Sequence, residues 1–216
     1  MFILEIIGTI AFAVSGAFVG IKTSLDIFGV IFVGCITAFG GGILRDILVG
    51  VTPPTVFYNP HILFIAVITS AVVFIVAYIN RQRFDEFREQ ITHINNVFDA
   101  VGLAAFSVMG TEVALAKGFG SSAFVSIVLG MLTGVGGGIF RDILVDTTPY
   151  VFKKHIYALA SIFGSFVYYI LRRTIMSTLI SSVVAMVLVV AVRMLATKYL
   201  WSLPKIKFEN NDNLPD

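Results

Sequence analysis

Residues 34–53 read GCITAFGGGILRDILVGVTP, and residues 130–149 read GMLTGVGGGIFRDILVDTTP. Thirteen of these twenty positions are identical at a constant offset of 96. The match continues upstream, where residues 5–16 and 99–110 share an acidic residue, two glycines and a phenylalanine at an offset of 94. We therefore interpret residues 1–79 and 97–171 as two copies of one unit.

The composition places both copies in a membrane. The 216 residues are 57% hydrophobic and only 13% charged, and the mean hydropathy is +0.94. A soluble domain carries about 25% charged residues, so this chain lacks the polar residues that a water-exposed surface needs. The net charge of +2 is too small to favour nucleic acid as a partner, and no basic run is interleaved with aromatic residues. We expect an all-α, polytopic membrane protein.

Seven apolar stretches are long enough to cross the hydrocarbon core of a bilayer, which takes about 20 helical residues. They are Phe2–Ile21, Ile27–Leu48, Ile62–Ile79, Val97–Leu115, Ala123–Val145, Ile156–Leu171 and Met176–Leu195. The charge-dense residues 80–96 are expected to link the two copies on the cytoplasmic side. A seventh transmembrane helix is expected within residues 172–195, and a polar, disordered cytoplasmic tail at residues 196–216.

The odd number of spans in each copy has a topological consequence. The second copy must enter the membrane from the opposite side, which predicts an inverted repeat, an architecture of proteins that move solutes across bilayers. Lys and Arg collect on the cytoplasmic side of membrane proteins. The predicted spans place ten Lys and Arg residues on the side of the C-terminus and three on the side of the N-terminus. We therefore expect the N-terminus outside and the C-terminus in the cytoplasm.

Each copy carries three consecutive glycines just past the middle of its second span. Each Gly lowers helix stability by about 1 kcal/mol relative to Ala, so the triplets predict a kink or a broken turn. Broken backbone at membrane depth is tolerated only beside protein or a water-filled cavity, which places the triplets on the solute pathway. The alternative is close helix packing, which we assign to the small-residue spacing of Gly16 with Gly20 and of Gly130 with Gly134.

An Arg-Asp pair begins three residues after each triplet. Charges inside a span are costly unless they are paired or hydrated, and they mark function by default. Thr, Gly and Arg recur four residues apart, so one helix face carries a hydroxyl, exposed backbone and a charge. The alternatives are that each Arg snorkels to the interface or that Arg and Asp cap neighbouring helices. The expected pathway residues are Thr37, Gly40, Gly41, Gly42, Arg45, Asp46, Thr133, Gly136, Gly137, Gly138, Arg141 and Asp142.

Two acidic residues are expected to neutralise the buried arginines. In the predicted topology Glu5 lies at the depth of Arg45, and Asp99 lies at the depth of Arg141. Because a buried charge in a bilayer is usually paired, we predict Glu5–Arg45 and Asp99–Arg141 contacts, either direct or through the adjacent aspartates or water. The alternative is that each Arg binds only backbone carbonyls at the glycine break.

No pattern in the sequence indicates an enzyme. The histidines, His61, His93 and His155, fall in predicted loops. The glycine triplet lacks the G-x-G-x-x-G spacing of a dinucleotide loop and follows no strand. Cys35 is the single cysteine, so it offers neither an intrachain disulfide nor a zinc pattern. We expect no catalytic residue, no metal and no cofactor.

The doubled Gly-Gly-Gly-Ile-x-Arg-Asp-Ile-Leu motif, the seven spans and the length resemble the prokaryotic branch of the trimeric intracellular cation (TRIC) channels, over nearly the whole chain to about Ala196. The resemblance implies a homotrimer among the lipids of a prokaryotic plasma membrane. It also implies that each protomer has a pore for K⁺ and other monovalent cations, lined by kinked second and fifth spans at the two triplets and their Arg-Asp pairs. The lipid-binding Lys motif of eukaryotic members is not found here. The sequence is also similar to bacterial domains described as glycine transporters, so a secondary transporter of glycine or another small solute is the alternative.

Overall fold

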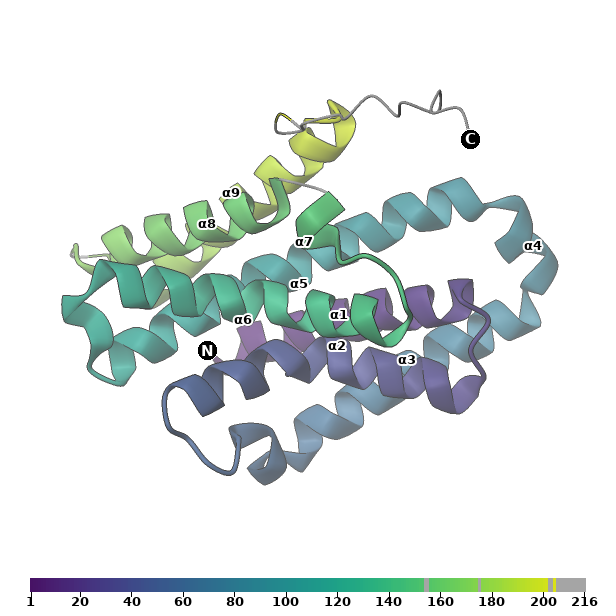
Figure 1. The fold of residues 1–216 in the computed structure, drawn as a ribbon, viewed down its shortest axis with the longest axis horizontal. Helices are drawn as coiled ribbons and strands as arrows, with labels where there is room; N and C mark the ends of the chain where they lie inside the picture. Colours follow the sequence, from purple (N-terminus) through teal and green to yellow (C-terminus); the bar gives the residue numbers. More distant parts are fainter. Residues whose placement is uncertain (154–155, 175, 202–203, 205–216) are drawn as a thin grey trace, which may run out of the picture.

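The computed structural model describes residues 1–153, 156–174, 176–201 and 204, which fold as a bundle of helices (Figure 1). Most of the tail predicted at residues 196–216 lies outside these residues, as do Lys154 and His155. The α-helices are α1 (Phe2–Lys22), α2 (Ile27–Leu48), α3 (Pro60–Ile79), α4 (Arg81–Glu86), α5 (Arg88–Ala116), α6 (Ala123–Leu144), α7 (Tyr150–Lys153), α8 (Ile156–Arg172) and α9 (Thr178–Lys198). Two short 3₁₀ helices, η1 (Thr55–Tyr58) and η2 (Phe119–Ser121), lie in connections.

Short polar residues mark where the long helices begin. The Asp26 carboxylate accepts a hydrogen bond from the Gly29 amide at 2.7 Å and caps α2. Ser122 and Ser177 cap α6 and α9 in the same way. Pro60 starts α3, where its missing N–H would have no helical partner. The helix boundaries therefore follow from local sequence chemistry.

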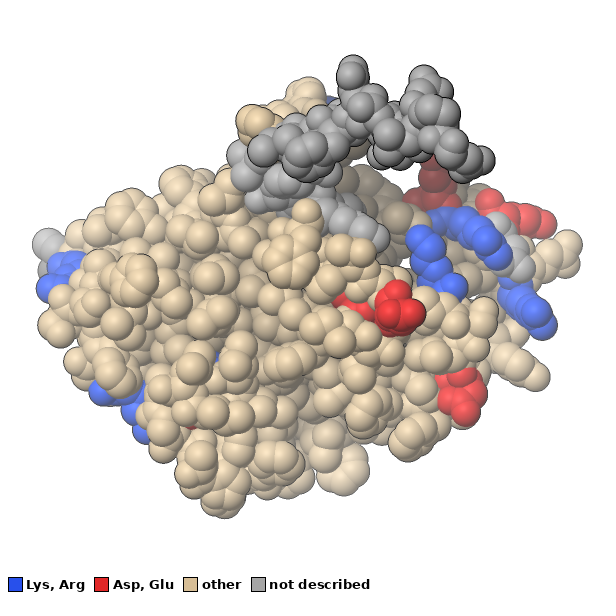
Figure 2. All heavy atoms as spheres, in the orientation of Figure 1, with Lys and Arg blue, Asp and Glu red and all other residues tan. Residues whose placement is uncertain are grey.

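Within the described part of the chain, six helices are long and apolar enough to cross a membrane, namely α1, α2, α3, α5, α6 and α9. The seventh predicted span corresponds to α8, which is apolar but shorter, at 17 residues. Figure 2 shows a face that is mostly uncharged, with Lys and Arg side chains gathered towards its two ends. This distribution suits a bilayer around the middle of the bundle, where charged side chains are costly.

The predicted linker at residues 80–96 is helical. It consists of α4 and the first turns of α5, which then continues into the apolar segment to give a helix of 29 residues. The linker contains neither Gly nor Pro, so no residue in it opposes helix formation. The boundary between solvated linker and apolar span is therefore a change of composition within α5.

Helices α1, α2, α5 and α6 form the centre of the bundle, and α3 packs on α1 and α2. Helices α8 and α9 cover α5, and α8 also packs on α6. The contacts between α1 and α5 run in opposite directions along the two helices. Gly8 lies against Phe106, Phe12 lies against Gly102, and the Ser15 hydroxyl donates to Asp99. The two helices are therefore antiparallel neighbours.

The glycine triplets do not break their helices. Residues 27–48 and 123–144 are continuous α-helices through both triplets, so the expected broken turn is wrong. A Cβ on Gly41 would lie 2.0 Å from the Thr133 carbonyl oxygen, and a Cβ on Gly137 would lie 2.0 Å from the Thr37 carbonyl oxygen. The central glycines therefore allow the backbones of α2 and α6 to touch, and this contact outweighs their low helix propensity.

Candidate functional site

Each Arg of the repeated motif is paired with the Asp that follows it. Arg45 Nε lies 2.9 Å from Asp46 Oδ1, and Arg141 Nε lies 2.8 Å from Asp142 Oδ1. All four side chains are at least nine-tenths buried. Snorkelling of either guanidinium to solvent is therefore excluded in this structure.

The second oxygen of each aspartate holds the connection after its helix. Asp46 Oδ2 accepts hydrogen bonds from the Thr55 amide at 2.8 Å and the Thr55 hydroxyl at 2.7 Å, at the start of η1. Asp142 Oδ2 accepts a hydrogen bond from the Tyr150 amide at 2.8 Å, at the start of α7. The capping role considered for these aspartates is thus present together with the ion pairs. In both copies of the motif a Pro follows the Asp at the same distance, at Pro53 and Pro149. This shared spacing is the sequence feature that could have indicated the capping role.

Arg141 has a further set of partners from other helices. Its Nη1 lies 2.7 Å from Asp99 Oδ1 on α5 and 2.8 Å from the Ser15 hydroxyl on α1. Arg141, Asp99 and Ser15 are all fully buried. The Asp99–Arg141 contact predicted from the sequence is therefore direct, and three helices meet at this guanidinium.

Two residues that the sequence analysis did not select lie next to this pair. The Tyr157 ring on α8 is stacked with Arg193 of α9, whose guanidinium carbon is 4.7 Å from the ring centroid. Arg193 is one of the ten Lys and Arg residues that the sequence assigns to the cytoplasmic side, yet it is only 2% exposed. Its position within the apolar run of residues 187–196 is the feature that could have revealed its burial.

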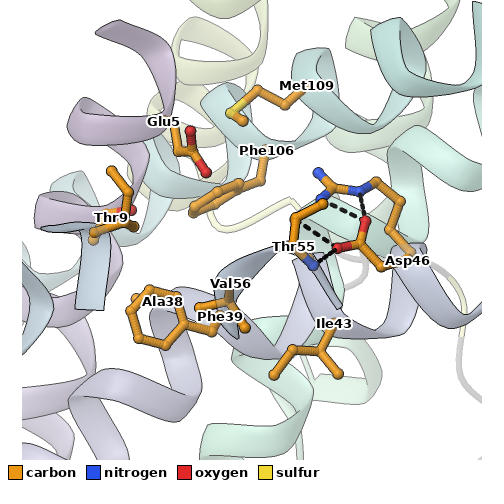
Figure 3. Close-up of a pocket in the computed structure, with 13 residues that line it drawn as sticks. Glu5, Thr9, Ala38, Phe39, Ile43, Asp46, Thr55, Val56, Phe106 and Met109 are labelled. Carbon is orange, nitrogen blue, oxygen red and sulfur yellow. Dashed lines mark hydrogen bonds and ion pairs between the residues drawn. The ribbon is translucent and has the colours of Figure 1, made fainter. Parts of the chain in front are cut away.

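Arg45 makes no corresponding contact with Glu5. Among the described residues the Glu5 carboxylate has no hydrogen bond or ion pair, and a cavity of ≈ 30 Å³ lies beside both side chains. We call it the Glu5 cavity (Figure 3). It is bordered by Glu5, Thr9, Ala38, Phe39, Gly42, Ile43, Arg45, Asp46, Thr55, Val56, Ile62, Phe106 and Met109. The direct form of the predicted Glu5–Arg45 contact is absent from this structure, because Arg45 turns to Asp46, and the form through Asp46 or water stays a prediction.

A second hollow, the wide cavity, lies at the opposite end of α1. Its volume is ≈ 680 Å³, and its lining includes the cations Lys22, Arg81 and Arg88. Asn95 and Tyr150 also border it, and Tyr150 places its ring 5.2 Å from the Arg141 guanidinium carbon. The wide cavity therefore ends close to the buried Arg141 cluster.

Four other predicted pathway residues, Thr37, Gly41, Thr133 and Gly137, are buried inside the packed helices. The Thr37 and Thr133 hydroxyls each donate to the carbonyl oxygen four residues earlier, at 2.6 Å, and both residues are fully buried. Gly41 and Gly137 form the contact between α2 and α6. Gly42, Arg45 and Asp46 are the predicted pathway residues that border the Glu5 cavity.

Comparisons with known proteins agree on one group. Residues 2–78 and 96–173 match the family described as "Glycine transporter". The UPF0126 inner membrane protein YadS of Escherichia coli K12 is 34% identical over 211 residues, which are 96% of this chain and 97% of that protein. With the six long apolar helices, this likeness indicates a multi-pass integral membrane protein.

Two solved structures share the whole arrangement of helices. A prokaryotic TRIC channel in 0.5 M KCl superimposes with a TM-score of 0.82 and 35% identity, covering 93% of this chain and 97% of that one. The TRIC trimeric intracellular cation channel orthologue from Rhodobacter sphaeroides gives a TM-score of 0.82 at 26% identity, covering 93% and 98%. The fold is therefore that of these proteins over nearly its full length.

Proposed function

The chain belongs to the glycine-transporter family and is related to the prokaryotic TRIC channels, and on this premise we propose that it is a channel for monovalent cations, K⁺ among them. The observation that carries the proposal is the likeness to a prokaryotic TRIC channel in KCl, which extends over 93% of the chain. The Rhodobacter sphaeroides orthologue is described as a trimeric channel, and we propose that this chain also forms a homotrimer. Each protomer then has its own pathway among α1, α2, α5 and α6.

Residues 1–79 and 97–171 form, in this proposal, two inverted repeats around a pseudo-two-fold axis. Two contacts between counterpart positions support it. Phe12 and Phe106 stack with ring centroids 5.3 Å apart, and Gly41 approaches Gly137 where α2 crosses α6. Residues related by a two-fold axis touch each other only at that axis, and inverted repeats place transport pathways there.

The pathway that we propose joins the Glu5 cavity to the wide cavity through this crossing. The two motif copies, with their glycine triplets and Arg-Asp pairs, line its two halves. In the present structure the crossing is closed, since the backbones of α2 and α6 are in contact at Gly41 and Gly137. Conduction therefore requires the two helices to separate there. The orientation follows the Lys and Arg distribution, with the Glu5 cavity facing outward and the wide cavity facing the cytoplasm.

Planar-bilayer recording of the purified protein tests this function. We expect discrete current steps in symmetric KCl and, in a KCl gradient, a reversal potential close to that of K⁺ and far from that of Cl⁻. Loss of the steps in Gly41→Leu, with trimer assembly unchanged, would connect the current to the proposed crossing. A purified, folded protein that gives no current under either condition would refute the channel.

The second candidate is a carrier of glycine or another small solute. The wide cavity favours it, because ≈ 680 Å³ lies within the usual size of a ligand site and Lys22 and Arg81 could face a carboxylate. A carrier binds its solute in a saturable site that opens to alternate sides, whereas a channel needs weak sites that release ions quickly. Saturable uptake of glycine into proteoliposomes without current would establish the carrier in place of the channel.

A further inference from the structure

The sequence repeat allows the surroundings of the two motif arginines to be compared position by position. Arg45 corresponds to Arg141 at an offset of 96, and Glu5 corresponds to Asp99 at an offset of 94. The offset of 94 also pairs Ser15 with Met109. In one half the guanidinium bonds the acid and the hydroxyl, so a cation of the chain itself occupies the site.

In the other half the same place is a cavity. Glu5 and Met109, the counterparts of Asp99 and Ser15, both border it. Met109 cannot replace Ser15, because a thioether is only a weak acceptor for an N–H group. Arg45 instead places both Nε and Nη2 on Asp46, at 2.9 and 2.7 Å. The Glu5 carboxylate consequently forms no ion pair with any of the described residues.

A buried hydroxyl in the Glu5 cavity also lacks a partner. Thr9 is 1% exposed, and its Oγ1 has no hydrogen-bond partner among the residues that the structure describes. The buried Thr37, Thr111 and Thr133 hydroxyls each donate to the carbonyl four residues earlier, so Thr9 differs from the other buried threonines of the central helices. It follows Glu5 by one helical turn, and both side chains project from α1 on the side of Phe106 (Figure 3). An unsatisfied buried polar group destabilises the folded protein, and an occupant of the cavity that accepts or donates at Thr9 Oγ1 would remove this loss.

The charges and size of the cavity define its occupant. Among the described residues that border the cavity, Glu5 and Asp46 are acidic and Arg45 is basic, so the lining has a net charge of −1 that one further unit positive charge would balance. The volume of ≈ 30 Å³ exceeds the 10–15 Å³ or so that one water requires, so it suits a single partly dehydrated ion. Carboxylate and hydroxyl oxygens are ligands of hard cations, and the Phe106 ring adds a surface that attracts cations. Repulsion by Arg45 disfavours a divalent ion.

We propose that Glu5 and Thr9 form a binding site for one monovalent cation, K⁺ or Na⁺, in the Glu5 cavity. The ion takes the place that the Arg141 guanidinium fills in the other half of the molecule. The proposal rests on the proposed function, because it assigns the first site that a permeating cation meets at this end of the pathway. In one half of the repeat the cation is thus the Arg141 side chain, and in the other half it is an ion from solution.

Thermal unfolding of the purified protein in detergent measures the site without requiring conduction. KCl replaces N-methyl-D-glucamine chloride at constant ionic strength, so that only specific binding raises the melting temperature. We expect a saturable rise with K⁺ for the native protein and for Thr9→Ser. In Thr9→Val the half-saturating K⁺ concentration should increase about two- to tenfold, as expected for one lost hydroxyl ligand, and in Glu5→Gln the rise should be lost.

Crystals of the unaltered protein in RbCl supply a second measurement that is independent of the variants. We expect an anomalous peak between Glu5 and Thr9. No saturable K⁺ effect and no Rb⁺ peak would overturn the site, even if the protein conducts K⁺ in bilayers. A saturable K⁺ effect that Glu5→Gln removes would establish the site, even if no current is observed, and only the proposed channel would then fail.

Discussion

The contact between α2 and α6 leads to a prediction that separates a packing role of the glycine triplets from a hinge role. A Cβ on Gly41 would lie 2.0 Å from the Thr133 carbonyl oxygen and 3.0 Å from its carbon, whereas real Cβ contacts essentially never fall below 3.0 Å. Both atoms belong to the backbone and cannot rotate away. In Gly41→Ala, helices α2 and α6 must therefore separate by about 1 Å or more. Overpacking of this kind in a protein core is destabilising by about 1–3 kcal/mol.

The neighbouring Gly42 supplies the matched control. A Cβ there would meet only Arg45 Nη2, at 3.7 Å, which is an ordinary contact. Gly42→Ala should therefore be neutral or stabilise the protein by up to about 1 kcal/mol through helix propensity. The same gain of up to about 1 kcal/mol offsets part of the overpacking loss in Gly41→Ala, and we expect a net destabilisation of about 1 kcal/mol.

Thermal unfolding followed by loss of the folded peak in size-exclusion chromatography measures both variants. At about 2–4 °C per kcal/mol for a chain of this size, Gly41→Ala should melt about 2–4 °C lower and Gly42→Ala should melt at or above the native temperature. Gly137→Ala should behave like Gly41→Ala, since its Cβ would lie 2.0 Å from the Thr37 carbonyl oxygen. Equal losses in Gly41→Ala and Gly42→Ala would refute the packing argument and favour a hinge at the whole triplet.

Two further predictions concern the buried charges and the topology. Asp99→Asn leaves the fully buried Arg141 guanidinium without one of its charge partners and should destabilise the protein by about 3–5 kcal/mol. Glu5→Gln breaks no ion pair among the described residues and should lower the melting temperature much less. Similar losses of stability in both variants would contradict the asymmetry between the two halves. Single cysteines at the exposed Gln82 and Ser121, in a Cys35→Ala background, should react with impermeant maleimide from opposite sides of the membrane, and labelling of both from one side would exclude the inverted repeat.

The positions of the helices could be predicted from the sequence because they depend on local properties. Hydrophobic length places α1, α2 and α6 to within a residue or two of their observed bounds, and capping residues such as Asp26 mark the starts. The helical linker could also have been predicted from its lack of Gly and Pro. The repeated Arg-Asp motif identified buried charges, since unpaired charges are excluded from a bilayer regardless of the fold.

The roles of particular side chains were decided only by the tertiary structure. Glycine is both the weakest ordinary helix former and the residue that permits backbone contact, so the triplets predict a break or a packing surface equally well until the opposing helix is known. The partners of the two motif arginines differ because α1 offers Ser15 to Arg141 whereas α5 places Met109 near Arg45. Such choices depend on distances of a few ångströms between helices that are remote in the sequence. The sequence by itself therefore determined the membrane helices and their duplication, and packing between the helices determined that one half is closed by an arginine while the other retains a cavity.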